Sequence, residues 1–346
     1  MEKTIIKLEN YTKSYNGKVV MSNINLEIKE GEFFTFLGSS GCGKTTILRS
    51  ISGLDKPTSG KIYIDSVDVT NFEPQKRHVN TIFQNYSLFP LMNIYDNIAF
   101  GLRMKKVDEE EIEKRVKDML ELVHLEGYEK RFPKDLSGGE QQRVSVIRGL
   151  INNPKVLLLD EPLSALDLKL RKQMQVELKH LQKKLGITFV YVTHDQDEAL
   201  TMSDRICLLK DNHIEQIGTP IEIYENPKNV YVADFLGDVN VFTSTVNNNK
   251  VLIENFELDI KNDEISDNEK VKIVVRPENI KISKIEKMNS LQGIIREKIY
   301  DGATTKFIVK TENLKIKVLI LGNDDLFDKE DTVYLSFKTS DAIVLK

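Results

Sequence analysis

The segment Gly38-Ser-Ser-Gly-Cys-Gly-Lys-Thr45 constrains the fold of this 346-residue chain more than any other segment. It matches the pattern G-x-x-x-x-G-K-[ST], follows the apolar run 33–37 and precedes a helix-like run that starts at Thr46. In such a loop, glycines let backbone N–H groups surround phosphate oxygens at a helix N-terminus, the lysine adds a positive charge, and the threonine hydroxyl can bind Mg²⁺. The alternative is a glycine-rich turn before a helix. Because a strand and a helix flank the motif, we favour the phosphate-binding loop.

The nucleotide contacts predicted in this loop are consecutive: Gly38, Ser39, Ser40, Gly41, Cys42, Gly43, Lys44, Thr45 and Thr46. Cys42 lies two residues from Lys44 at a helix N-terminus, an electropositive setting that lowers the pKa of a thiol. We therefore expect Cys42 to be reactive if its thiol is exposed, whereas Cys207, in an apolar run, should react slowly. The alternative is that Cys42 only fills a small-residue position.

Two carboxylates follow the apolar run 156–159, which indicates a buried strand. Asp160 is expected beside Mg²⁺, and Glu161 is expected to polarise a water molecule at the carboxyl end of a parallel sheet. Taken alone, an acidic pair after an apolar run is usually a solvated strand end. Downstream of a phosphate-binding loop, the catalytic interpretation is favoured.

The segment Leu136-Ser-Gly-Gly-Glu-Gln-Gln-Arg143 predicts a second anion site at a helix N-terminus. Free N–H groups and the helix dipole at Ser137, Gly138 and Gly139 suit an anion. A capping box between Ser137 and Glu140 is the alternative, and both can hold at once. The segment resembles the signature motif of ATP-binding cassette (ABC) proteins, in which the serine and the glycines face the γ-phosphate bound by the opposite subunit. Glutamine is commoner at the position of Glu140, and the helix reads Ser145-Val-Ile-Arg-Gly where small alanines are usual.

Four further residues match motifs of the same family in the expected order. The resemblance implies that Tyr15 stacks on adenine, that Gln84 contacts Mg²⁺ and the attacking water, that Asp167 belongs to the loop crossing the dimer interface, and that His194 is the switch histidine at the γ-phosphate. A lone residue of these types is usually structural. Agreement of several motifs in order favours the family.

The chain divides into an α/β part and a β-rich part. Strand-like runs alternate with helical patterns at 108–124 and 168–185, which predicts a parallel sheet, and strand-like runs recur after Gly237 without a long helical pattern. We expect a P-loop ABC ATPase domain at 1–235, with a helical subdomain near 86–154. An all-β domain should follow at 236–346. Runs 216–224 and 276–280 resemble importer ATPases whose C-terminal domain is OB-like, of the TOBE type, and regulatory.

Composition limits the function classes. The 49 basic and 53 acidic residues give a net charge of −4, without the basic excess of a dedicated nucleic-acid binder. Two cysteines are too few for a disulfide framework and fit a reducing cytosol. The charged N-terminus argues against a signal peptide, and the apolar runs are too short to span a bilayer, so we expect any membrane role to depend on a partner.

The resemblance implies an ATP-hydrolysing importer subunit that binds ATP and Mg²⁺ and forms a head-to-tail homodimer. It would act at the cytoplasmic face of the cell membrane with two permease subunits. Apolar Leu88, Phe89, Leu91 and Ile94 are candidates for contact with a permease helix, and the alternative is that most of them form core. Runs 170–175, 185–190 and 199–205 are most similar to importers of polyamines (spermidine and putrescine), which implies an extracytoplasmic polyamine-binding protein.

Three alternatives stay open at this point. The solute is iron, sugar or sulfate instead; the protein is a soluble ABC ATPase of DNA repair or translation; or it is a regulatory nucleotide-binding module. The second class usually has two cassettes or a long coiled coil, and the third would be expected to lack Glu161 or His194.

Overall fold

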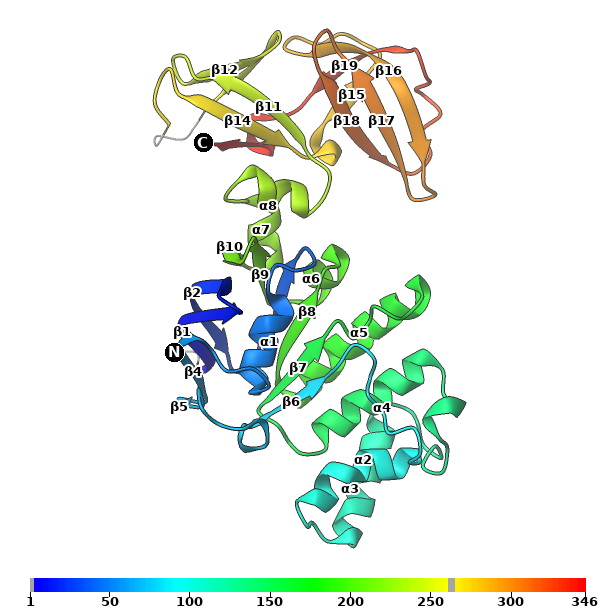
Figure 1. The fold of residues 1–346 in the computed structure, drawn as a ribbon. Coiled ribbons are helices and arrows are strands. Elements are labelled where there is room, and N and C mark those ends of the chain that lie inside the picture. The colour runs from blue at the N-terminus through cyan, green and yellow to red at the C-terminus, as the bar shows by residue number, and fades with distance from the viewer. Residues whose placement is uncertain (1–2, 261–264) are drawn as a thin grey trace. The chain divides into compact units, whose positions relative to one another are not determined.

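The computed structural model describes residues 3–260 and 265–346. Two compact units are present, Met1–Ile221 and Glu222–Lys346, and each is described by itself (Figure 1).

Unit 1 is built on a six-stranded sheet in the order β10-β9-β3-β8-β7-β6. Its strands are β3 (Phe33–Gly38), β6 (Val79–Ile82), β7 (Val156–Asp160), β8 (Thr188–Thr193), β9 (Arg205–Lys210) and β10 (His213–Gly218). Strand β3 runs parallel to β8 and β9, and β7 runs parallel to β6 and β8. Only β10 pairs antiparallel, with β9. The predicted parallel α/β sheet is confirmed, and its parallel strands bring several carboxyl ends to one edge.

Helices cover both faces of this sheet because alternate residues of each strand point to opposite sides. Phe34 and Phe36 of β3 pack in one core cluster with helix α1 (Lys44–Ser52). Phe33 packs on the other face, in a cluster that includes residues of α4 (Gly138–Leu150), α5 (Leu168–Leu185) and α6 (Gln196–Met202). The predicted helix at 168–185 is confirmed, and Gly186 ends it at a positive φ of 63°.

A second sheet of unit 1 has the order β2-β1-β4-β5 and is antiparallel. Its strands are β1 (Thr4–Tyr15), β2 (Lys18–Lys29), β4 (Ser59–Ile64) and β5 (Val67–Asp68). It packs against the α1 face, since Ile6, Leu26 and Ile62 share the core cluster of Phe34. This sheet was not predicted, although β2 alternates buried and exposed residues over much of its length.

A helical region contains α2 (Ile94–Met104), α3 (Glu109–Leu122) and α4, with short 3-10 turns at Pro74–Lys76 and Pro133–Asp135 elsewhere in the unit. The predicted helix at 108–124 corresponds to α3, which Asp108 caps through its carboxylate and the amide of Glu110 at 3.3 Å. Apolar residues of the three helices form one core, which includes Ile98, Val116 and Val144.

Unit 2 is all-β apart from short helical turns. The helices are α7 (Pro220–Glu225), which begins at the division, and α8 (Val230–Phe235), with 3-10 turns at Pro277–Asn279 and Thr339–Asp341. The strands are β11 (Asn240–Thr245), β12 (Lys250–Ile253), β13 (Phe256–Asp259), β14 (Lys270–Val275), β15 (Lys281–Ser283), β16 (Leu291–Tyr300), β17 (Thr304–Lys310), β18 (Lys315–Leu321), β19 (Thr332–Ser336) and β20 (Ala342–Leu345). They form antiparallel sheets in the orders β11-β14-β20, β12-β13 and β15-β19-β16-β17-β18. The predicted change to an all-β C-terminal domain is confirmed.

Segment 222–235 packs within unit 2, although the sequence analysis placed it in the first domain. The guanidinium of Arg276 donates to the carbonyls of Ala233 at 2.8 Å and of Tyr224 at 3.2 Å, and it stacks on the Tyr224 ring at 4.0 Å. These contacts join residues that are distant in the chain. The change in sequence pattern near Gly237, from which the boundary was predicted, therefore could not reveal them. The boundary between 235 and 236 stays a prediction.

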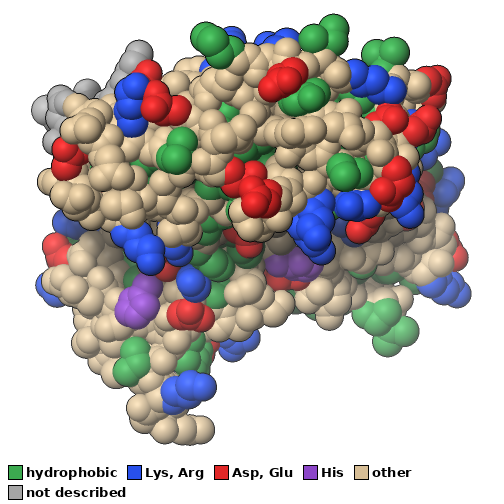
Figure 2. All heavy atoms as spheres, turned by 90° about the horizontal axis from the view of Figure 1, so that it is seen from above, with side chains coloured by type: hydrophobic (Ala, Val, Ile, Leu, Met, Phe, Trp, Pro, Cys, Tyr) green, Lys and Arg blue, Asp and Glu red, His purple; other side chains and the backbone are tan. Residues whose placement is uncertain are grey.

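Charges of both signs are mixed on the face shown in Figure 2, as the near balance of basic and acidic residues leads one to expect. Within 3–260 and 265–346, every helix falls short of the length and apolarity that crossing a membrane requires.

Candidate nucleotide site

The phosphate-binding loop joins the end of β3 to the start of α1. Its last glycine, Gly43, caps α1 with φ at 101°, in the left-handed region that favours glycine. A Cβ atom there would lie 2.2 Å from the sulfur of Met21 in β2. The backbone conformation therefore favours glycine at this position, and a larger residue would also have to displace the buried Met21 side chain.

Lys44 is 5% exposed and directs its ammonium group back into the loop. Its Nζ atom donates to the carbonyl oxygens of Gly38 at 2.7 Å and Ser39 at 2.8 Å. The positive charge is thus held beside the loop backbone that is predicted to surround phosphate oxygens.

Thr45 and Asp160 form the candidate metal site. Thr45 Oγ1 donates to Asp160 Oδ1 at 3.1 Å, which joins the first turn of α1 to the end of β7. Burial raises the pKa of Asp160, and the Thr45 hydroxyl opposes that shift. Mg²⁺ prefers oxygen ligands and usually takes one or two carboxylates together with substrate phosphates. A hydroxyl and a carboxylate beside a phosphate-binding loop fit this donor set.

Glu161 and His194 meet at the ends of the adjacent strands β7 and β8. His194 Nδ1 lies 3.2 Å from Glu161 Oε2, and the Glu161 amide donates to the carbonyl of Val192 at 3.0 Å. Glu161 has φ at 45°, a left-handed conformation that is rare for glutamate and typical of functional sites. A cavity of about 70 Å³ lies beside them, which is enough room for water.

Gln84 is linked to Glu161 through Ser164. The Gln84 amide Nε2 donates to Ser164 Oγ at 3.1 Å, and that hydroxyl donates to the Glu161 carbonyl at 2.9 Å. Asp167 accepts a hydrogen bond from the Leu170 amide at 3.0 Å and caps α5. The resemblance placed Ser164 in the same loop as Asp167, but its hydrogen bonds to Gln84 and Glu161 were not predicted.

Tyr15 lies at the end of β1 and keeps its ring 40% exposed. Its hydroxyl donates to Asp55 at 2.9 Å, and Asp55 is also paired with Arg49 of α1 at 2.7 Å. The ring is thus anchored at its hydroxyl edge, and the Lys13 ammonium lies 4.6 Å from the ring centroid. The stacking of Tyr15 on adenine stays a prediction. No local pattern in the sequence predicted the role of Asp55.

Ser137 and Glu140 form the capping box that the sequence offered as one alternative. The Ser137 amide donates to Glu140 Oε2 at 2.7 Å, and the Glu140 amide donates to Ser137 Oγ at 3.4 Å. Tyr128 donates to the other carboxylate oxygen of Glu140 at 2.9 Å. The Ser137 amide and hydroxyl hold the pKa of Glu140 below its ordinary value.

In one chain the loop residues gather with Asp160, Glu161 and His194, and Gln84 reaches this group through Ser164. Across the described residues, no hydrogen bond or ion pair joins Ser137, Gly138, Gly139 or Glu140 to that group. A site shared between the signature of one subunit and the loop of the other stays a prediction.

The expectation that the Cys42 thiol has a lowered pKa and is reactive is wrong, because the side chain is buried. The side chain is 4% exposed, and burial raises the pKa of its thiol even though Lys44 Nζ lies 3.9 Å away. Loss of hydration outweighs the nearby positive charge. Cys207 is also buried, and burial raises the pKa of its thiol strongly, as expected.

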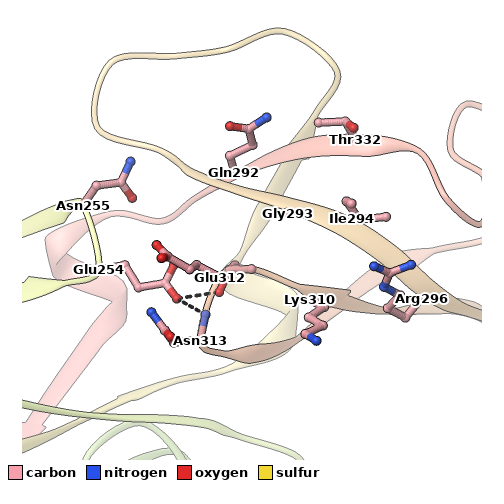
Figure 3. A pocket seen from close by; sticks show the side chains of 11 residues that line it. Glu254, Asn255, Gln292, Gly293, Ile294, Arg296, Lys310, Glu312, Asn313 and Thr332 are labelled. Atoms are coloured by element: carbon pink, nitrogen blue, oxygen red, sulfur yellow. Dashed lines mark hydrogen bonds between the residues drawn. The ribbon is translucent and has the colours of Figure 1, made fainter.

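Unit 2 holds a different kind of cavity, of about 710 Å³, between β16 and the turns that follow β12 and β17 (Figure 3). Glu254 bridges two of its walls by accepting hydrogen bonds from the Thr311 hydroxyl and the Asn313 amide, both at 2.8 Å. Its lining contains no serine, cysteine or histidine. The residues predicted for nucleotide chemistry all lie in unit 1.

Comparison with known proteins agrees with this division. The ABC transporter family model matches residues 21–164, and the TOBE domain model matches residues 273–345. The spermidine/putrescine import ATP-binding protein PotA of Aliivibrio fischeri is 51% identical over 86% of this chain and 82% of that protein. The PotA protein of Pasteurella multocida is 53% identical over 85% of this chain and 81% of its own length.

Solved structures resemble unit 1. The ATP-binding cassette MJ0796, a dimer bound to ADP and Pi, is 37% identical with a TM-score of 0.56, covering 62% of this chain and 99% of that chain. The cbiO1 protein of Clostridium perfringens is 32% identical with a TM-score of 0.60, covering 64% and 91%.

The fold and the site define a P-loop ATPase of the cassette type, a class in which adenine nucleotides bind and cassettes dimerise. The chain belongs to the ATP-binding proteins of ABC transporters.

Proposed function

We propose that this chain powers the import of polyamines, spermidine and putrescine, as a homodimer of ATPase subunits. Two permease subunits and an extracytoplasmic polyamine-binding protein complete the importer, and the chain acts at the cytoplasmic face of the cell membrane. The assignment of polyamines as the solute is supported by one observation: about half the residues are identical to those of spermidine/putrescine import proteins over most of both chains. Iron, sugar or sulfate as the solute, and a soluble ABC role, are the outcomes against which the proposal is tested.

In the proposed mechanism, the loop at 38–46 binds the phosphates and Tyr15 stacks on adenine. Glu161 accepts the proton of the attacking water, and His194, 3.2 Å from that carboxylate, holds the γ-phosphate side of the site. Gln84 orients the water. Asp167 lies at the dimer interface, and Ser137, Gly138, Gly139 and Glu140 contribute the helix N-terminus that faces the partner's nucleotide.

Thr45 and Asp160, with Gln84, are the residues that would hold Mg²⁺. The bound ion would neutralise negative charge on the β- and γ-phosphates. The short Thr45 to Asp160 contact of 3.1 Å supports this assignment, because it brings two oxygen donors together beside the loop.

Permease docking is proposed for the segment between β6 and α2. Leu91 is 92% exposed there, and Phe89 packs on Phe100 with ring centroids 4.7 Å apart. Ile94 is fully buried and Leu88 is partly buried, so both belong to the helical core. Of the four apolar residues considered for a permease contact, Leu91 is the one that fits best.

The test is reconstitution of the chain with the permease subunits encoded beside it, in vesicles that contain ATP. Spermidine-loaded and putrescine-loaded binding protein should stimulate both ATP hydrolysis and solute uptake. Stimulation by an iron, sugar or sulfate binding protein instead would reassign the solute. ATP hydrolysis without stimulation by any of them, and without membrane association, would favour the soluble class.

A further inference from the structure

The segment after Gln84 holds two consecutive residues in a strained backbone conformation. Tyr86 has φ at 58° and Ser87 has φ at 47°, both in the left-handed region that residues other than glycine rarely adopt. Such conformations persist when surrounding contacts hold them, and they cluster at functional sites. The side chains that bind the carbonyl groups of this pair come from α4.

Arg148 and Ser145 of α4 bind the carbonyl groups of the strained pair. The Arg148 guanidinium donates to the Ser87 carbonyl at 2.7 Å and to the Tyr86 carbonyl at 2.8 Å. Ser145 Oγ donates to the same Tyr86 carbonyl at 3.0 Å. Three hydrogen bonds from one helix face therefore fix two adjacent peptide groups.

The hydrogen bonds found for the Arg148 guanidinium in the described residues all go to backbone carbonyl oxygens. No ion pair is found for it in the part of the chain that the structure describes, its guanidinium lies 5.4 Å from the Phe89 ring, and burial lowers its pKa. A planar guanidinium can bind two carbonyls at once, which a lysine ammonium or a small side chain does less well.

The clamped pair is continuous with Gln84. The Tyr86 amide donates to the Phe83 carbonyl at 2.9 Å, which closes a turn that contains Gln84. On its other side, Gln84 is held by Ser164 at 3.1 Å. The strand before the turn is also joined to α4, since Asn80 Nδ2 donates to the Gly149 carbonyl at 2.5 Å. The same helix begins at Gly138, directly after Ser137.

We propose that Arg148, assisted by Ser145, is a positioning residue that fixes the position of Gln84 relative to the signature helix α4. A shift of α4, whose first turn is predicted to face the partner's nucleotide, is then transmitted to Gln84 through the carbonyls of Tyr86 and Ser87. The inference rests on the role of Gln84 in the proposed function.

The first test compares purified Arg148→Ala, Arg148→Lys and Ser145→Ala with the unaltered protein. We expect both Arg148 variants to bind ATP normally but to lose roughly 10- to 100-fold in kcat, because small misplacements of a positioned group have effects of that size. The Mg²⁺ concentration for half-maximal activity should rise. Ser145→Ala should show a smaller loss in the same direction, since two of the three hydrogen bonds remain.

Arg103→Ala is the matched control, because Arg103 lies in α2, where it pairs with Asp96 and Glu109 and lies 5.5 Å from the Tyr95 ring, and none of these residues belongs to the proposed site. It should retain normal kcat and Mg²⁺ dependence. A purely structural role for Arg148 would lower the melting temperature while leaving both quantities unchanged in the folded protein, and that result would overturn the proposal. If Arg148→Ala does not fold, Arg148→Lys and Ser145→Ala decide the matter.

A double-mutant cycle tests whether Arg148 acts through Gln84. If it does, Gln84→Ala combined with Arg148→Ala should lose no more activity than Gln84→Ala alone. Multiplicative losses would show that Arg148 acts elsewhere and would overturn the proposal. Full activity and normal Mg²⁺ dependence in Gln84→Ala would instead reject the role of Gln84 itself, which is a different result. The assay needs no solute, so a wrong polyamine assignment leaves it unaffected.

Discussion

His194 Nδ1 lies 3.2 Å from Glu161 Oε2, which joins the ends of two neighbouring parallel strands. Strand pairing explains the contact, because Asp160 of β7 is in register with Val192 of β8, and the residues that follow leave the same edge of the sheet. The two side chains share a cavity with Ser164. The proposed base and the proposed switch residue are therefore neighbours in one chain.

Glu161→Gln should retain ATP binding and lose turnover. General-base catalysis contributes about 10²- to 10⁴-fold, and an amide cannot accept the proton, while the phosphate-binding loop is untouched. Phosphate release at steady state and ATP affinity measure the two effects. Glu113→Gln, an exposed carboxylate of α3, is the control. Phosphate release at the unaltered rate by Glu161→Gln would remove Glu161 from the mechanism.

Lys44→Ala should fail at nucleotide binding. The ammonium group, which donates to the carbonyls of Gly38 and Ser39, is the positive charge proposed to bind the phosphates. ATP should raise the melting temperature of the unaltered protein, since a ligand that binds only the folded state stabilises it, and should not do so for the variant. Lys61→Ala, with an exposed side chain, should behave like the unaltered protein. An unchanged ATP affinity in Lys44→Ala would contradict the loop assignment.

Ser137→Arg should bind ATP and fail to hydrolyse it, because the signature is proposed to act only on the nucleotide held by the partner subunit. Mixing this variant with Lys44→Ala creates one composite site with an unaltered loop and an unaltered signature. Partial recovery of ATP hydrolysis is expected, measured across mixing ratios. Absence of recovery, once the mixed dimer is shown to form, would count against a shared site.

The capping box should make stability depend on pH in the acid range. The pKa of Glu140 is held below its ordinary value of 4.5 by the Ser137 amide and hydroxyl. A carboxylate with a lowered pKa stabilises the folded state above the unfolded value, and this contribution is lost as pH falls through the lower folded value. Glu140 is partly exposed, so the effect should be about 0.5 to 1 kcal/mol after screening. The free energy of unfolding, measured with urea between about pH 3 and about pH 6, should depend less on pH in Glu140→Gln than in the unaltered protein.

Both cysteines should react slowly with maleimide in the folded protein. Burial raises the pKa of the Cys42 thiol, and Cys207 is buried as well. Mass spectrometry of the alkylated protein measures the rate at each site, with the urea-unfolded chain as the reference. Alkylation of Cys42 at the unfolded rate would show that the loop opens readily and would restore the original expectation.

Local patterns predicted much of the fold. The apolar spacing in 168–185 has the helical period, and α5 has those bounds. Strands such as β18 (Lys315–Leu321) likewise agree with the strand-like runs predicted after Gly237. The antiparallel sheet of β1, β2, β4 and β5 was missed only in part for a long-range reason: β1 pairs with β4 across β2, β3 and α1, which no short window of sequence contains. The β1–β2 hairpin is local, and Asn16-Gly17 between its strands was an available turn signal.

The sequence by itself determined the chemistry available to this protein: a phosphate-binding loop, a carboxylate pair and a helix N-terminus with a capping box. These are local properties, because they depend on residues that are close in the chain. Only the tertiary structure decided which of them meet. Thr45 contacts Asp160 across 115 residues, and Gln84 contacts Ser164 across 80, because parallel strands bring their carboxyl ends to one edge. It also decided that Cys42 is buried, since burial depends on every neighbour that packs around a side chain, and a motif specifies few of them.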